Sequence, residues 1–160
     1  MKGIVVGVSL SGKTTALKHL RSQDNTLPIE EMDALLAQEN RGVFPTDIQH
    51  KKELAARIVE NIINRDAVIF FTNTDYFTLN DLKVAKEKGF KIIQLMLGIE
   101  ELQKRNKYRM ENEGYEDLSK WFAGMLRYQK EVKDAGLVDE ELNANFPVAE
   151  LALKLEDLIK

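Results

Sequence analysis

The residues best suited to chemistry lie near the N-terminus, in the stretch GVSLSGKTT. It follows the pattern G-x-x-x-x-G-K-[ST], whose fixed positions are Gly7, Gly12, Lys13 and Thr14. The two glycines let the backbone bend and approach a ligand at points where a Cβ would clash. The backbone N–H groups of residues 9–14 can then form a concave anion site at the start of a helix. The chemistry that this pattern indicates is the binding of a nucleotide's phosphates.

Two side chains of this stretch have separate tasks at a polyphosphate. Lys13 can reach the β- and γ-phosphates as a point charge, and the Thr14 hydroxyl can ligate Mg²⁺. A glycine turn with an accidental lysine is the structural alternative. Against it, a β-branched apolar run precedes the turn and an amphipathic pattern follows it. We therefore expect nucleotide contacts from Gly7, Ser9, Leu10, Ser11, Gly12, Lys13, Thr14 and Thr15.

The composition of the 160 residues is that of one globular domain. Hydrophobic residues make up 44% and charged residues 31%, which excludes the disordered and membrane classes. A net charge of −3 argues against broad binding to nucleic-acid backbones, which needs a basic face. The absence of cysteine excludes disulfides, thiolate metal sites and cysteine nucleophiles. Because the sequence contains neither a signal-peptide pattern nor an apolar run of membrane-spanning length, we expect a cytoplasmic protein.

Short apolar runs alternate with longer amphipathic segments along the chain, which is typical of βα units around a mostly parallel sheet. We predict strands at about residues 3–8, 28–32, 67–71, 90–97 and 141–144. We predict helices at about residues 13–22, 47–64, 78–88, 100–113, 115–135 and 147–159. In such a fold, the ligand cleft lies over the carboxyl ends of the strands.

Four stretches of the chain resemble the small P-loop kinases, which include shikimate, gluconate, adenylate and other nucleoside or nucleotide kinases. GVSLSGKTT is similar to their Walker A loop, and EEMDALL to the segment after their second strand. LMLGIEELQKRNKYR resembles their fourth strand and the helix that opens the lid. LNANFPVAELALKLEDLI resembles their last strand, adenine-side loop and final helix. The resemblance implies one α/β domain over residues 1–160 with the three-layer P-loop NTPase fold. That fold has a five-stranded parallel sheet of order 2-3-1-4-5, helices on both faces and a small helical lid, here at about residues 104–128.

The resemblance also implies ATP and Mg²⁺ as cofactors, and an arginine where the lid opens. Phosphoryl transfer needs cations near the γ-phosphate besides the loop lysine. Arg105 and Arg109 lie four residues apart on one predicted helix, so both can converge on a polyphosphate. The alternative is a solvated helix face rich in charge pairs. We assign both arginines to catalysis, Arg105 also to ATP, and Asn145 to the adenine side.

Asp33 is the candidate for contact with the reacting hydroxyl. A carboxylate there could orient and deprotonate the acceptor and hold Mg²⁺ through water. The structural alternative is a helix N-cap. Glu31, two residues earlier on the same face of the strand, could join it. The remaining acceptor-site candidates, each of which could equally be a surface or packing residue, are Arg41, Arg57, Thr72, Asn73 and Asp75.

Together these residues predict an ATP-dependent small-molecule kinase. The first acceptor we expect is a nucleoside or nucleotide, the second a sugar acid or shikimate-like polyol, and the third a polynucleotide 5′-hydroxyl. The rival class is a non-catalytic nucleotide-binding regulatory protein. It is favoured by Thr72, which stands where many P-loop ATPases end the third strand with aspartate. We expect a monomer or weak dimer, with no membrane partner and no nucleic-acid partner other than such a 5′ end.

Overall fold

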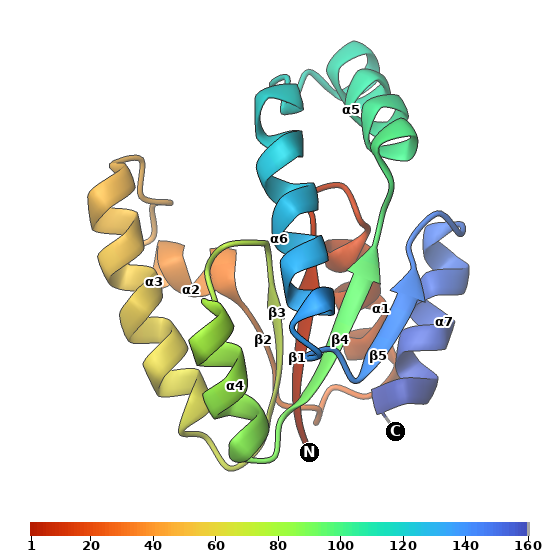
Figure 1. Cartoon of the computed structure of the whole chain (residues 1–160). Coiled ribbons are helices and arrows are strands. Elements are labelled where there is room, and N and C mark those ends of the chain that lie inside the picture. The colour runs from red at the N-terminus through yellow and green to blue at the C-terminus, as the bar shows by residue number, and fades with distance from the viewer. Residues whose placement is uncertain (160) are drawn as a thin grey trace.

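Five parallel strands form the central sheet of the computed structural model, which describes residues 1–159 (Figure 1). The strands are β1 (Lys2–Gly7), β2 (Ile29–Glu31), β3 (Val68–Thr72), β4 (Lys91–Met96) and β5 (Glu140–Asn143). Their order is β2-β3-β1-β4-β5, and every neighbouring pair is parallel. This arrangement confirms the predicted topology of the P-loop NTPase fold.

Helices cover both faces of the sheet, so each strand alternates its side chains between two cores. On β1, Val5 packs with α1 (Lys13–Gln23) and α7 (Val148–Ile159). Ile4 and Val6 pack on the opposite face with helices α2 to α4 and the second half of α6. These helices are α2 (Met32–Glu39), α3 (Ile48–Ile63), α4 (Leu79–Glu87) and α6 (Phe122–Asp134). The central strands are mostly apolar because both of their faces are buried, and Thr72 and Gln94 are their buried polar residues.

Two segments differ from the sequence-based prediction. Helix α2 was not predicted. It follows β2 without an intervening turn residue, so the sequence shows no boundary between them. The helix predicted at residues 115–135 is the second case, because it begins only at the short 3₁₀ turn η1 (Ser119–Trp121) and continues as α6. Asn106 explains this late start. Its amide donates to Asp117 Oδ1 at 2.8 Å, and its Oδ1 accepts from Leu118 N at 3.0 Å, which holds the preceding segment out of a helix.

Helix α5 (Ile99–Glu113) and the start of α6 lie beyond the carboxyl ends of the strands (Figure 1). We call α5, the connecting segment 114–118, η1 and the first turn of α6 the lid. Within residues 1–159, no helix combines the length and apolar character needed to cross a membrane.

Candidate active site

The loop between β1 and α1 has the backbone of a phosphate-binding turn. Gly12 precedes α1 with φ +92°, and a Cβ there would lie 3.3 Å from Val148 Cγ1. A Cβ on Gly7 would lie 2.7 Å from Ser11 Oγ. Close contacts around the loop therefore require both glycines. Leu10 also takes a left-handed conformation, φ +73°, which costs a non-glycine residue about 1–2 kcal/mol.

Lys13 directs its amine back onto this loop. Its Nζ donates to Gly7 O at 2.7 Å and to Val8 O at 2.8 Å. Burial lowers the pKa of Lys13 to about 7, and the negative charges of Asp33 and Glu31 oppose part of that shift. The amine therefore lies among oxygen atoms of the loop, where its positive charge would stabilise a bound anion most strongly.

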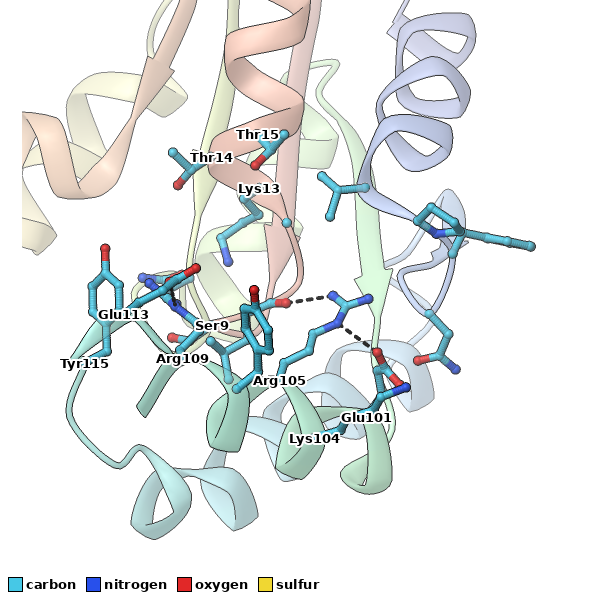
Figure 2. Close-up of a pocket in the computed structure, with 18 of the residues that line it drawn as sticks. Ser9, Lys13, Thr14, Thr15, Glu101, Lys104, Arg105, Arg109, Glu113 and Tyr115 are labelled. Atoms are coloured by element: carbon cyan, nitrogen blue, oxygen red, sulfur yellow. Dashed lines mark hydrogen bonds and ion pairs between the residues drawn. The ribbon is translucent and has the colours of Figure 1, made fainter. Parts of the chain in front are cut away.

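A cleft of about 1060 Å³ opens beside this loop (Figure 2). Its walls come from the phosphate-binding loop, the start of α2, the loop after β3, helix α5 and the loop before α7. Its volume matches the largest small-molecule sites, so a nucleotide and a small acceptor both fit. Of the predicted residues, Gly7 and Ser11 are buried and do not line the cleft. The others that line the cleft are Ser9, Leu10, Gly12, Lys13, Thr14, Thr15, Asp33, Asn73, Arg105, Arg109 and Asn145.

Asp33 lies in the first turn of α2, close to Lys13. Asn73 Nδ2 donates to Asp33 Oδ2 at 3.4 Å, whereas Oδ1 is buried and has no hydrogen-bond partner among the described residues. Burial raises the pKa of Asp33, and Lys13, Lys51 and the Asn73 bond oppose that rise. Glu31, not Asp33, precedes the helix as its N-cap. The unpartnered buried oxygen of Asp33 marks a position where a ligand group would be bound.

The oxygen groups near Lys13 fit a Mg²⁺ ion. The Thr14 hydroxyl lines the cleft, and Asp33 Oδ1 is a carboxylate oxygen without a partner among residues 1–159. Mg²⁺ prefers such oxygen ligands and is usually held by one or two carboxylates together with substrate phosphates. Within the described chain, no group of three or more histidine, aspartate or glutamate side chains could hold a metal ion. The phosphates of a bound nucleotide and water would supply the other ligands of such an ion.

Glu31, the last residue of β2, lines the same end of the cleft. Burial raises the pKa of Glu31, the nearby Asp33 carboxylate raises it further, and Lys13, Arg21 and Lys18 oppose the rise. Two carboxylates with raised pKa values thus lie beside one amine with a lowered pKa. Such opposed shifts are typical of sites that handle protons and charged substrates.

Arg105 on α5 is held by three partners. Its Nη1 donates to Leu10 O at 2.7 Å, and its Nε pairs with Glu101 Oε1 at 3.1 Å (Figure 2). Its Nη2 donates to Ala144 O, in the loop after β5, at 2.6 Å. The guanidinium therefore joins the lid to the loops at both ends of the cleft. Its predicted role in binding ATP stays a prediction.

Arg109 lies one turn further along α5 and reaches the same cleft (Figure 2). Its Nε lies 3.5 Å from Glu113 Oε2, and its guanidinium carbon lies 3.9 Å from the centroid of the Tyr115 ring. A γ-phosphate that approached Arg109 would compete with Glu113 for the same cation. Tyr115 is exposed in the lid and lines the cleft.

The loop between β5 and α7 closes the other end of the cleft. Asn145 lies there as expected, together with Phe146 and Pro147. Phe146 was not among the predicted residues, and its ring centroid lies 3.5 Å from Lys154 Nζ. An aromatic ring beside an exposed amide suits a nucleotide base. The signal that could have found it is the aromatic residue next to Asn145 in LNANFP.

Four predicted acceptor-site residues lie outside the lining of this cleft. Arg57 is exposed on the polar face of α3, and Arg41 is exposed in the loop after α2 with φ +60°. Asp75 is also exposed, and Thr72 is buried with its hydroxyl donating to Asn73 O at 3.1 Å. Arg41, Arg57 and Asp75 do not line the space beside Lys13, whereas Thr72 lines a smaller cavity there with Lys13 and Asp33.

Two unpredicted residues lie near the Asp33 carboxylate. Lys51, in the first turn of α3, lowers the pKa of Asp33. Tyr76, in the loop after β3, has a pKa raised to about 12 by burial and by the charge of Asp33. Both residues are far from Asp33 in the sequence, and neither belongs to a motif. Only the folded chain brings them close enough to Asp33 to interact with its charge.

Comparison with solved structures identifies the fold. Shikimate kinase from Aquifex aeolicus matches with a TM-score of 0.73 and 14% identity, over 99% of this chain and 96% of that one. The chain has the fold of the small P-loop kinases. Shikimate kinase from Bacteroides thetaiotaomicron matches with a TM-score of 0.69 and 15% identity, over 99% and 98% of the two chains. A gluconokinase from Sinorhizobium meliloti matches with a TM-score of 0.61 and 18% identity, over 94% and 86%.

The sequence alone identifies no relative. No family model matches it, and no curated protein matches it. The resemblance to P-loop kinases is thus confirmed at the level of the fold, while the activity has to be argued from the residues of the site.

Proposed function

We propose that this chain is a kinase that transfers the γ-phosphoryl group of Mg·ATP to a hydroxyl of a small acceptor. The observation that carries the proposal is the convergence of Lys13, Thr14 and Asp33 on one cleft. Lys13 and the loop amides would bind the phosphates. Thr14 would ligate Mg²⁺ directly and Asp33 would hold it through a water, and the ion would neutralise phosphate charge when bound.

In the proposed reaction, the acceptor oxygen attacks the γ-phosphorus, and the bond from that phosphorus to the bridging oxygen breaks. The acceptor proton passes to Asp33 Oδ1, and ADP leaves with the bridging oxygen. A raised pKa suits Asp33 to accept this proton. Arg105 and Arg109, which reach the cleft from the lid, would stabilise the charge that spreads over the γ-phosphoryl oxygens.

We infer that the acceptor is a small polyhydroxy acid. A nucleoside monophosphate would need arginine forks around its phosphate, and the arginines that line the cleft within residues 1–159 are Arg105 and Arg109, both on the lid. After Lys13, the cation with the largest effect on the pKa of Asp33 is Lys51, a point charge suited to a single carboxylate. The structures that share the fold include enzymes named for shikimate and gluconate, which supports the same class.

Production of ADP from Mg·ATP tests the proposal. The purified protein would be supplied with polyhydroxy acids, neutral polyols, nucleosides and nucleoside monophosphates, one at a time. We expect a rise above background with a polyhydroxy acid, and its loss in Lys13→Ala. Turnover with a nucleoside instead would keep the kinase and overturn the acceptor class.

Asp33→Asn separates a kinase from a regulatory nucleotide-binding protein. In a kinase, it should lower acceptor-dependent turnover by about 100-fold or more, because the acceptor proton loses its base, while Mg·ATP affinity changes by only a few fold. Asp66→Asn is the matched control, since Asp66 is exposed and outside the cleft. Tight Mg·ATP binding without turnover on any acceptor would favour the regulatory protein.

A further inference from the structure

Leu97 and Gly98 form the junction between β4 and α5, and this junction has no feature of its own that fixes the direction of α5. Leu97 follows β4, and Gly98 precedes the helix with no side-chain cap bond. A Cβ on Gly98 would meet nothing within 4 Å. The buried residues of α5 are Leu102 and Asn106, so little of the helix packs against the body of the protein. The direction of α5 is therefore set by contacts made to the junction itself, together with the bonds from Arg105 to Leu10 O and Ala144 O.

Gln129 on α6 makes those contacts. Its Oε1 accepts from Leu97 N at 3.1 Å, and its Nε2 donates to Leu97 O at 3.3 Å. The backbone of Leu97 donates one of these bonds and accepts the other. Together the two bonds fix both the position and the orientation of Leu97. Leu97 lies two residues before the first residue of α5, so a small rotation there would move the far end of the helix by a much larger distance.

The turn of α6 that carries Gln129 is itself fixed to the body of the protein. Gln94, a β4 residue that is 1% exposed, donates from Nε2 to Gln129 O at 3.1 Å. The neighbouring Tyr128 donates from its buried hydroxyl to Phe77 O at 2.6 Å. Gln129 therefore connects the lid to a part of α6 that is held by the loop after β3 and by the sheet.

We propose that Gln129 is a positioning residue for the lid: by holding Leu97, it keeps Arg105 and Arg109 directed at the nucleotide cleft. The inference rests on the proposed function, because that function assigns the two arginines to Mg·ATP. Gln129 does not line the cleft, so it acts only through α5. This is the task of a supporting residue, whose hydrogen bonds hold a binding group in its productive geometry.

Binding of Mg·ATP to the purified chain, measured by calorimetry, tests the inference without any acceptor. Gln129→Met keeps the length of the side chain and removes both bonds to Leu97. We expect the Kd for Mg·ATP to rise about tenfold, because a lid released from Gln129 has to be ordered again when Mg·ATP binds. Gln49→Met is the matched control, because Gln49 is exposed on α3 and bonds only to Glu53 in the described structure. It should leave the Kd within twofold of the wild type.

A double-mutant cycle distinguishes positioning from general stability. If Gln129 acts through Arg105 and Arg109, Gln129→Met should weaken binding by less than twofold in a background that carries both Arg105→Ala and Arg109→Ala. The emission of Trp121, the one tryptophan of the sequence and a lid residue, should also shift in Gln129→Met before ligand is added. An unchanged Kd, or an effect of the same size in both backgrounds, would overturn the inference.

Two further results keep the outcome clear. If Gln129→Met does not fold, Gln129→Glu replaces it, since it retains an acceptor for Leu97 N and loses the donor to Leu97 O; it should raise the Kd in the same direction. If the wild type itself does not bind Mg·ATP, the proposed function fails. Normal wild-type binding with an unaffected variant rejects the role of Gln129 alone.

Discussion

Binding of Mg·ATP should take up a proton at Lys13, and the amount should rise with pH. Burial lowers the pKa of Lys13 to about 7 in the free protein. A bound polyphosphate places negative charge beside the amine and returns its pKa toward the ordinary value of about 10.4. The neutral fraction of free Lys13 then sets the uptake. It amounts to about 0.1 proton at pH 6, about 0.5 at pH 7 and about 0.9 at pH 8.

The sign of the pH dependence follows from proton linkage. Between pH 7 and about pH 10, the complex holds more protons at Lys13 than the free protein does. Affinity should therefore be greatest below pH 7 and should fall as the pH rises through that value. The limiting slope is about tenfold in Kd per pH unit, or about 1.4 kcal/mol.

Titration calorimetry in two buffers of different ionisation enthalpy measures this uptake directly. The difference between the two apparent binding enthalpies gives the number of protons exchanged at each pH. Lys13→Arg is the control, because arginine stays charged over the whole range and leaves only protons exchanged by the ligand and by other groups. Uptake near zero at pH 8, or equal uptake in the wild type and Lys13→Arg, would refute the reasoning about Lys13.

Three other substitutions test separate parts of the structure. Tyr128→Phe leaves Phe77 O without its buried donor and should lower the free energy of unfolding by about 1–2 kcal/mol, measured by denaturant unfolding. Gly7→Ala introduces a Cβ that contacts the loop and should weaken Mg·ATP binding at least tenfold by calorimetry, whereas Gly3→Ala, with its nearest contact at 3.8 Å, should not. Lys51→Met should raise the KM for an anionic acceptor about tenfold and leave the KM for ATP unchanged, in steady-state assays of ADP production.

The parts of this protein that the sequence predicts are those that depend on neighbouring residues. The alternation of apolar and amphipathic runs reflects packing on both faces of the sheet, and it predicts all five strands. The phosphate-binding loop is equally local, because the shape of the turn depends on Gly7 and Gly12 within it. The order of the strands came from the family resemblance, since local periodicity carries no information about which strands pair.

The acceptor end of the cleft depends on contacts between distant residues, and there prediction was partial. Arg57 looked suitable by charge, but the periodicity of α3 directs it to solvent, while Lys51 on the same helix acts on Asp33. The start of α6 was also missed, because the side chain of Asn106 stops a helix in a segment whose own residues permit one. Neither effect leaves a mark in the sequence near the residue concerned.

The triple anchoring of Arg105 has a consequence for ligand selection. Because one guanidinium bonds to both Leu10 O and Ala144 O, a single side chain bridges the phosphate-binding loop and the loop between β5 and α7. We therefore expect a nucleotide that binds across these two loops to be selected for its length before any contact to its base is made. Lengthening of either loop would have to be matched by a change at Arg105, so the two loops and the lid form a unit in which no part can vary alone.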